Sequence, residues 1–328
     1  MTAGRKRRVS YLNATYGYGY GWGGGSTMAE AVEVVGLGVS TLDLLMLVDH
    51  FPAGEGVERA HASVLQGGGP VATAMVTLAR LGARTSMIDR VGDDWRGRLI
   101  VEEFRREGVG TDHLLVQKEA SSSIASIMVR KDDGARHIVY APGDVDELSP
   151  ADLPEAAIAS ARILHLNGRH FEASLAAAAL AKKKGVTVSF DGGAHRFRPE
   201  LLPLIELADV CIVAREFALS CTGKSSMADA AAGLLGKGPG GVAITAGAEG
   251  SWVFTRKGSF HQPAFPVEHP VDTTGAGDAY HGAFLYGILR GFDLRRCAHL
   301  ATAVAARVIT ALGGRGGIPT SADLDEIV

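Results

Sequence analysis

The chain has 328 residues, of which 46% are hydrophobic, and this is enough for a sizeable core in one large or two modest domains. The formal net charge of −3 gives no global positive field that would recruit nucleic acid or an anionic membrane surface. Three scattered cysteines (Cys211, Cys221 and Cys297) without a C-x-x-C pair indicate a reduced cytoplasmic protein, and no apolar run approaches the roughly 20 residues of a membrane span.

The first 27 residues differ in composition from the rest of the chain. They contain a basic cluster at Arg5–Arg8 and a run rich in glycine and aromatic residues at Tyr16–Gly25, and Met28 lies shortly after that run. Because no apolar stretch separates the basic cluster from Met28, this segment lacks the pattern of a secretory signal. We predict that residues 1–27 form a disordered leader or extension, with a functional basic arm as the alternative, and that the folded domain covers residues 28–328.

The first predicted strand covers Val32–Val39 and contains the motif Gly36-Leu37-Gly38. Neither a third glycine nor a helix start comes after it, so the motif is only weak support for dinucleotide binding and for a dehydrogenase. Downstream, the apolar pattern and the positions of Pro and Gly predict a helix over Pro70–Leu81, a strand over Thr85–Val91 and a helix over Trp95–Glu107.

Two regions are typical of paired strands with no helix between them. Their predicted strands are Thr41–Phe51, Val57–Leu65, Ser123–Val129 and His137–Tyr140. In the second region, Asp132-Asp133-Gly134 separates the two strands, which is a hairpin signal. We predict that the segments at about 41–66 and 120–142 form a small β-sheet lid over the main sheet.

After Ala141 the pattern alternates between strands and alanine-rich helices such as Leu175–Lys184. The predicted strands are Ile163–Leu166, Thr187–Asp191, Val210–Val213 and Val242–Thr245. This alternation predicts an α/β fold with a mostly parallel sheet and helices on both faces. Its ligands should bind beyond the carboxyl ends of the strands.

The most informative stretch is the run Val271-Asp272-Thr273-Thr274-Gly275-Ala276-Gly277-Asp278, directly before an apolar helical segment. Glycines let a ligand approach the main chain, and the N–H groups and dipole of a helix start attract anions. We therefore expect an anion site at Gly275, Ala276 and Gly277. A carboxylate there would repel a resting anion, so we expect Asp278 to accept the proton of a hydroxyl that attacks phosphorus. The alternative is a glycine-rich helix start whose aspartate only complements the dipole.

This octapeptide resembles the second signature of the ribokinase-like (PfkB) carbohydrate kinases. The family's first signature, a Gly-Gly turn that leads into a helix of small residues, is matched by Gly67–Ala74. The resemblance extends from about Val32 to Pro319 and implies a ribokinase-like three-layer sandwich, with a small β-sheet lid, as one kinase domain over residues 28–328. Phrases that look most like the sulfofructose kinase and ketohexokinase branches are Gly67–Pro70, His261–Phe265, Gly314–Pro319 and His165–Arg169.

The segment Thr245-Ala246-Gly247-Ala248-Glu249-Gly250 matches the family pattern T-x-G-x-x-G. The resemblance implies that Thr245, Gly247 and Gly250 contact a nucleotide, for which ATP is the expected ligand. The alternative is a plain β-turn that joins two strands.

Two metal sites are implied by the same resemblance. Glu216 matches the family glutamate that orders the waters of Mg²⁺, although Val213 stands where the family pattern has asparagine. The alternative for Glu216 is a glutamate that caps a helix start. Asp272 and Thr274, together with carbonyls of the segment 313–317, resemble the family's loop for a monovalent cation, with K⁺ as the candidate ion.

The substrate side resembles the family only in part. Asp43 matches a family aspartate that binds substrate hydroxyls at the end of the first strand, and Gly67 and Gly68 would let hydroxyls reach backbone N–H groups. Ala72 stands where the family usually has an asparagine, so an amide for a sugar hydroxyl is missing. This departure argues against ribose-like specificity.

Two arginines are candidates for binding an anionic group on the substrate. Arg136 projects from the predicted lid hairpin, and Arg169 follows a strand end, where a guanidinium could hold such a group through two hydrogen bonds. The alternative for both is a solvated surface charge. His281 lies one helical turn after Asp278 and is expected to be a packing residue, and no His/Cys cluster has the spacing of zinc ligands.

These features predict a carbohydrate kinase that uses ATP and Mg²⁺ to phosphorylate a primary hydroxyl of a ketohexose or an anionic sugar derivative. The alternatives are a nucleoside kinase of the same fold and a catalytically silent regulator that binds sugar or nucleotide. The intact Asp278 argues against the regulator. We expect no nucleic-acid or membrane partner, and the resemblance implies a possible homodimer through the lid.

Overall fold

The computed structural model describes residues 31–327, so the predicted leader at 1–27 lies outside the described residues. The strands are β1 (Val34–Leu37), β2 (Thr41–Val48), β3 (Ala62–Gly68), β4 (Thr85–Gly92), β5 (Val109–Gly110), β6 (Leu114–Gln117), β7 (Ile124–Arg130), β8 (Arg136–Ala141), β9 (Ile163–Leu166), β10 (Thr187–Gly192), β11 (Val210–Ala214), β12 (Gly241–Thr245), β13 (Ser251–Thr255) and β14 (Gly258–Gln262).

The helices are α1 (Pro70–Arg80), α2 (Trp95–Arg106), α3 (Glu155–Ser160), α4 (Phe171–Lys184), α5 (Leu202–Leu207), α6 (Arg215–Thr222), α7 (Met227–Leu235), α8 (Ala276–Leu289), α9 (Leu294–Val308) and α10 (Leu324–Ile327). Short 3-10 helices are η1 (Pro150–Asp152), η2 (Pro199–Leu201), η3 (Gly247–Glu249) and η4 (Ser321–Asp323). Within this part of the chain, no helix combines the length and the apolar character needed to cross a membrane.

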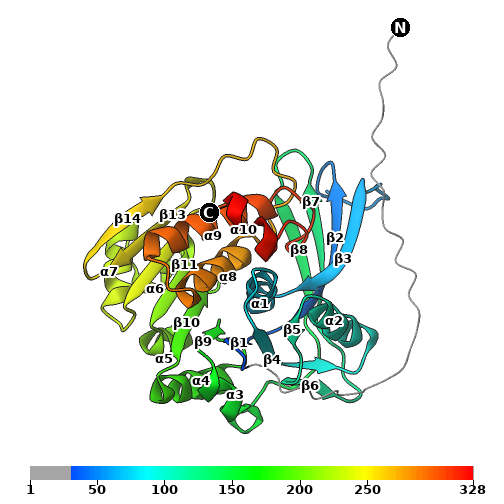
Figure 1. Ribbon diagram of the computed structural model, residues 1–328. Helices are drawn as coiled ribbons and strands as arrows, with labels where there is room; N and C mark the ends of the chain where they lie inside the picture. Colours follow the sequence, from blue (N-terminus) through cyan, green and yellow to red (C-terminus); the bar gives the residue numbers. More distant parts are fainter. Residues whose placement is uncertain (1–30, 328) are drawn as a thin grey trace. The chain divides into compact units, whose positions relative to one another are not determined.

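A large sheet forms the middle layer, in the order β14-β13-β12-β11-β10-β9-β1-β4-β5, with β6 paired to β4. Its strands run parallel except for β13 and β14, which extend one edge in antiparallel fashion. The helices α1, α2, α8 and α9 bury apolar side chains on one face, and α3 to α7 do so on the other (Figure 1). This confirms the predicted three-layer α/β sandwich.

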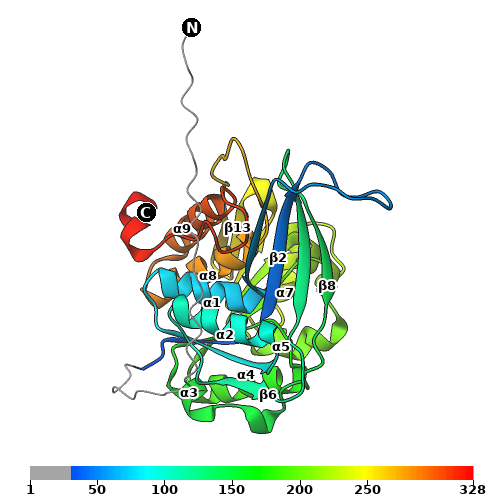
Figure 2. The ribbon, with the colours of Figure 1, turned by 90° about the vertical axis from the view of Figure 1, so that its right-hand side faces the viewer.

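The four remaining strands form a separate small sheet in the order β3-β2-β7-β8. The pairs β2/β3 and β7/β8 are antiparallel, and β2 runs parallel to β7 where the two pairs join. Figure 2 shows β2 and β8 upright in this sheet, with α1 and α2 beside it. The two predicted strand regions thus form one sheet, and its action as a lid stays a prediction.

Several strands differ from their predicted bounds. β1 is shorter than Val32–Val39, and β3 begins at Ala62, after an exposed stretch in which the side chain of Val57 is fully exposed. The sequence pattern does not indicate β5, β6 or β14. β5 is too short to show a period, β6 and β14 are mostly outside the core, and all three lie at the margins of the large sheet, where burial imposes the weakest pattern.

Small residues fix the position of α8, the helix that follows the glycine-rich run. A Cβ atom added at Gly282 would lie 2.6 Å from the Ala74 carbonyl oxygen of α1, and one at Gly287 would lie 2.7 Å from Cys297 Sγ of α9. These close approaches let α8 pack between α1 and α9 in the core. Asp278, in the first turn of α8, is therefore held on a rigid element.

Candidate active site

α8 starts with an open N-terminus. Gly275 is its N-cap with a φ of 72°, in the left-handed region that favours glycine, and no side chain caps the helix. The Ala279 N–H donates to the Gly275 carbonyl (2.8 Å), and the N–H groups of Ala276, Gly277 and Asp278 have no partner among the described residues. A Cβ atom added at Gly277 would meet no atom within 4 Å. The predicted anion site therefore has donors and room for a ligand.

The loop before α8 is held by the buried carboxylate of Asp272. Its Oδ1 accepts the Thr274 N–H and its Oδ2 accepts the Gly313 N–H, both at 2.8 Å. These bonds bring the 313–314 segment against Gly275, where an added Cβ would lie 2.5 Å from Gly314 Cα. Asp272 thus has a structural role in the loop. Thr274 Oγ1 is buried and, among the described residues, has no hydrogen-bond partner, so it could accept a cation.

Asp278 is partly exposed, and its surroundings favour the neutral carboxyl group. Burial among protein atoms raises its pKa above the ordinary value, and the negative charge of Asp191 adds to this rise. The positive charges of Arg196 and Arg136 oppose it, as does His281. A carboxylate whose pKa is raised in this way is a stronger base once it is ionised, which suits the abstraction of a hydroxyl proton.

Asp43 shares this neighbourhood. Asp43 is the third residue of β2 and does not lie at the end of β1, where it was predicted to lie. The negative charge of Asp278 acts on its carboxyl group. Burial raises the pKa of Asp43 to about 6, although its Oδ1 accepts the Thr41 hydroxyl at 2.7 Å. A Cβ atom at Gly68 would lie 1.9 Å from Asp43 Oδ2, so glycine is required there. The structure thus brings Asp43, Gly68 and Asp278 together.

Gly67 has a different role from the predicted one. Its N–H donates to the carboxylate of Glu103 on α2, so it is not free for a substrate hydroxyl. Arg315 holds this corner, because its guanidinium donates to Glu103 Oε1 (3.1 Å) and to the Gly68 carbonyl (3.2 Å). Ala72, where the family usually has asparagine, is fully buried in the core. The Gly-Gly turn is therefore held by the Glu103–Arg315 ion pair and supports Asp43.

The raised pKa of Asp43 predicts a pH-dependent stability. The folded carboxyl group has a pKa of about 6 against an ordinary 3.8, so the folded state binds more protons between these values. Stability should therefore fall as the pH rises from about 4 to about 6, by roughly 3 kcal/mol at most. Asp43→Asn removes this cost, and we expect urea titrations to show a more stable variant at pH 8 but not at pH 4.

The control for this measurement is Asp112→Asn, which changes an exposed carboxylate and should alter stability at neither pH. If Asp43→Asn destabilises the protein equally at both pH values, the hydrogen bond from Thr41 matters more than the buried charge, and the pH prediction is wrong.

Arg136 lies where the small sheet meets the glycine-rich run. It is the first residue of β8, its guanidinium donates to Thr273 Oγ1 (2.8 Å), and Thr273 Oγ1 in turn donates to the Gly134 carbonyl (3.0 Å). The charge of Arg136 also lowers the pKa of Asp278. The turn between β7 and β8 therefore contacts the loop before α8. The positively charged guanidinium of Arg136 lies near Asp278, the candidate base.

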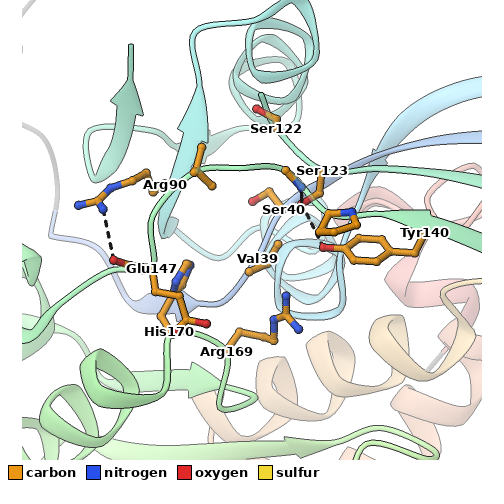
Figure 3. A pocket seen from close by; sticks show the side chains of 12 residues that line it. Val39, Ser40, Arg90, Ser122, Ser123, Tyr140, Glu147, Arg169 and His170 are labelled. Atoms are coloured by element: carbon orange, nitrogen blue, oxygen red, sulfur yellow. Dashed lines mark hydrogen bonds between the residues drawn. The ribbon is translucent and has the colours of Figure 1, made fainter. Parts of the chain in front are cut away.

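Arg169 lies at a separate place. It lines a cavity of about 170 Å³, together with Arg90, Tyr140 and His170, while Asp278 and Asp43 do not line it (Figure 3). His170 adopts a φ of 52° and its Nε2 lies 2.9 Å from Asp89 Oδ1, which fixes the chain after β9 and leaves Arg169 exposed. The structure does not bring the two predicted anion-binding arginines into one cluster.

The predicted nucleotide residues meet at one edge of the large sheet. β11 and β12 are neighbours in register, with Ala214 opposite Thr245, so exposed Glu216 in the first turn of α6 lies near the end of β12. Gly247 and Gly250 both have a positive φ, and η3 joins β12 to β13 between them. The predicted strand-turn-strand is confirmed, and its nucleotide contacts stay a prediction.

Three charged residues of this region are missed by sequence reasoning: Glu103, Arg315 and Arg196. Glu103 and Arg315 are 212 positions apart and form a buried ion pair at 3.1 Å. Burial raises the pKa values of both Asp191 and Asp278, and the charge of Arg196, which follows β10, partly opposes this rise. No local motif contains Glu103 or Arg196. The only available signal is that Arg315 lies within a glycine-rich run.

The site can be compared with known proteins. A family model described as pfkB family carbohydrate kinase matches residues 30–321. The chain is 28% identical over 300 residues to a nucleoside kinase of Methanothermobacter thermautotrophicus, covering 90% of this chain and 95% of the relative. It is also 28% identical over 290 residues to an ATP-dependent ribose-1-phosphate kinase of Halopiger xanaduensis, covering 88% and 96%.

Solved structures give the same answer for the fold. A putative ribokinase from Agrobacterium tumefaciens superposes with a TM-score of 0.82 at 27% identity, covering 90% of this chain and 97% of that one. The family match spans both glycine-rich signatures and the whole of the large and small sheets. The chain therefore belongs to the PfkB family of carbohydrate kinases and has its ribokinase-like fold.

Proposed function

We propose that this chain transfers the γ-phosphoryl group of ATP to a primary hydroxyl of a sugar, with Asp278 as the general base. The observation that carries this proposal is the first turn of α8, where unpaired N–H donors, an empty space at Gly277 and a carboxylate of raised pKa lie together. A regulator that only binds would gain nothing from a carboxylate beside an anion site. The same turn suits direct in-line transfer without a phosphoenzyme.

Each residue has a distinct part in this reaction. Asp278 accepts the hydroxyl proton as the oxygen attacks phosphorus, and the N–H groups of Ala276 and Gly277 stabilise the charge on the transferred group. Asp43 accepts hydrogen bonds from further sugar hydroxyls and so orients the attacking oxygen. Its support by Gly68 and Arg315 keeps this orientation fixed.

The residues at the ends of β11 and β12 fit a metal-bound nucleotide. The open turn at Gly247 has no atom within 4 Å of an added Cβ, and the exposed carboxylate of Glu216 is free of ion pairs among the residues described. Mg²⁺, when bound with the nucleotide, supplies charge neutralisation of the phosphates, and Glu216 would hold its waters. We also keep K⁺ as part of the proposal, because Thr274 Oγ1 is a buried acceptor without a partner among these residues.

The substrate class is proposed as a ketohexose or an anionic sugar derivative. Arg136 beside Thr273 and the lack of an amide at Ala72 support an anionic group over a neutral ribose. The ribose-1-phosphate kinase relative acts on an anionic sugar by its name, and the nucleoside kinase relative favours the alternative substrate class. Against a nucleoside, Tyr140 is the one Phe, Tyr or Trp of β8, and its hydroxyl donates to Ser123.

The proposal is tested by ADP formation from ATP and Mg²⁺ across hexoses, pentoses, sulfosugars, sugar phosphates and nucleosides. Turnover of a ketohexose or an anionic sugar supports the proposal as stated. Turnover of adenosine alone would replace it with the nucleoside kinase. If the chain binds ATP or a sugar but consumes no ATP with any of them, the silent regulator becomes the better description.

Arg136→Ala should raise KM for an anionic sugar by tenfold to a hundredfold, because a hydrogen bond to a charged group contributes about 1.5–3 kcal/mol. KM for the uncharged parent sugar should change much less. Steady-state kinetics with both sugars check this. Thr273→Val is the matched control, because it removes the hydrogen bond of Arg136 and keeps the charge. Equal losses for both sugars in Arg136→Ala would make Arg136 a residue that only holds the hairpin.

A homodimer through the small sheet stays part of the proposal. β8 is exposed along its whole length, and Ile138, Val139 and Leu65 expose 49%, 55% and 47% of their surface. β8 is an edge strand of the small sheet, and an exposed edge strand with apolar side chains can pair with another chain. Sedimentation analysis of the full chain would measure the state directly, and a monomer at micromolar concentration would remove the dimer from the proposal.

A further inference from the structure

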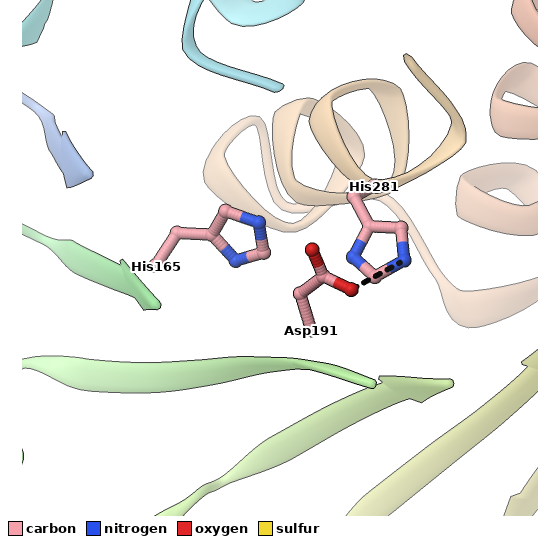
Figure 4. Close-up of side chains that lie close together, drawn as sticks. All are labelled: His165, Asp191 and His281. Atoms are coloured by element: carbon pink, nitrogen blue, oxygen red, sulfur yellow. Dashed lines mark ion pairs between the residues drawn. The ribbon is translucent and has the colours of Figure 1, made fainter. Parts of the chain in front are cut away.

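Beneath the candidate base lies a buried polar cluster of His165 on β9, Asp191 on β10 and His281 on α8. These residues are only 0%, 4% and 5% exposed, and one potential ligand atom from each lies within 4.8 Å of the others. Figure 4 shows the carboxylate of Asp191 between the two imidazole rings. His281 therefore does more than pack in the core, because it is also part of this buried polar cluster. The sequence shows no zinc-ligand spacing here because three separate elements contribute the residues.

Three polar atoms of this cluster have no partner among the described residues. They are Nε2 of His165, Oδ2 of Asp191 and Nδ1 of His281. Leaving a buried polar atom without a partner is costly, so three such atoms in one place indicate a common occupant. Asp191 Oδ1 and His281 Nε2 are 3.8 Å apart, too far for a hydrogen bond. This pair does not include the three unpaired atoms, so the distance shows only that the two side chains do not satisfy each other.

We propose that His165, Asp191 and His281 form a binding site for a divalent transition-metal ion of the zinc type, which ties α8 to β9 and β10. Two imidazoles and one carboxylate form a nitrogen and oxygen donor set that suits such ions. Ser189 Oγ lies 3.1 Å from His165 Nδ1 and leaves Nε2 to face the cluster, which is the usual orienting contact of a metal-binding histidine.

The charges around the cluster favour a cation over a water molecule. His165 Nε2 and His281 Nδ1 are buried and have no partner among the described residues, so each imidazole presents a nitrogen that can act as a ligand. Burial disfavours the charged form of both Asp191 and Asp278, and their two carboxylates also repel each other. Arg196 is the cation that the structure places near both. A dication would neutralise Asp191, whereas a water molecule would leave this repulsion in place.

The test uses the full chain, treated with a chelator and then dialysed against Zn²⁺ as the probe. We expect one tightly bound Zn²⁺ per chain, which excess Mg²⁺ does not displace because Mg²⁺ prefers oxygen ligands. His165→Gln and His281→Gln should each weaken this binding at least tenfold. His137→Gln, which changes an exposed histidine of β8, is the matched control and should leave it unchanged.

A crystal soaked in Zn²⁺ keeps the proposal testable if the buried variants fail to fold. An anomalous scattering peak between the three side chains supports it. An anomalous peak only at surface histidines, or ordinary water density between the three side chains, would overturn it and identify the occupant as an internal water. Neither readout depends on kinase activity, so this result and the test of the proposed function are independent.

Discussion

Asp278→Asn should lower kcat by about 10²–10⁴, the usual contribution of general acid–base catalysis, while nucleotide binding is largely retained. The asparagine keeps the size of the side chain in the first turn of α8 but cannot accept the hydroxyl proton. The N–H groups of that turn and the space at Gly277 stay in place, so the anion site survives. Steady-state kinetics with the best sugar, together with calorimetric titration of nucleotide, measure the two effects separately.

The pH profile gives a second readout for Asp278. Because burial raises its pKa, activity should fall as the pH drops through that raised value, above the range of an ordinary aspartate. The residual activity of Asp278→Asn should not show this fall in activity at low pH. Asp112→Asn again serves as the control at an exposed position. Turnover near that of the wild type in Asp278→Asn would remove this carboxylate from the mechanism.

The part of the site that could be predicted from the sequence is the part that is contiguous in it. The run 271–278 contains its glycines, its helix start and its carboxylate within eight residues, so local rules for helix termini are enough to identify it. The alternating strands after Ala141 likewise predicted the parallel sheet, because buried strands have continuous apolar runs. The edge strands β5, β6 and β14 lack that burial and gave no such signal.

The part that could not be predicted depends on contacts between distant residues. Glu103 of α2 accepts hydrogen bonds from the Gly67 N–H and from Arg315. Arg315 also donates to the Gly68 carbonyl, so three separate parts of the chain meet at this point. No spacing rule reports such a contact. The same holds for His165 and Asp191, which meet His281 only because β9 and β10 are neighbours beneath α8. Sequence patterns identify ligands that lie within one element. The charged residues around this site come from separate elements, which only the folded sheet brings together.

Two glycines of the α8 start should respond in opposite ways to alanine. Gly275 has a φ of 72°, and a Cβ there would lie 2.5 Å from Gly314 Cα, which belongs to backbone and cannot rotate away. Gly275→Ala should therefore cost about 1–2 kcal/mol for the left-handed conformation, plus the cost of the clash, and should lower both the melting temperature and kcat.

Gly277→Ala should instead leave the fold intact or stabilise it by about 0.5–1 kcal/mol, because Gly277 is helical and an added Cβ meets no protein atom within 4 Å. Its methyl group would occupy the space in front of the unpaired N–H donors, so kcat/KM should fall, by up to the roughly 10²–10³ that the loss of one such donor costs. Thermal unfolding and kinetics of the same preparation separate the two effects. A Gly277→Ala enzyme that is stable and as active as the wild type would show that the transferred group does not lie at this helix start, because only the ligand can meet that methyl group.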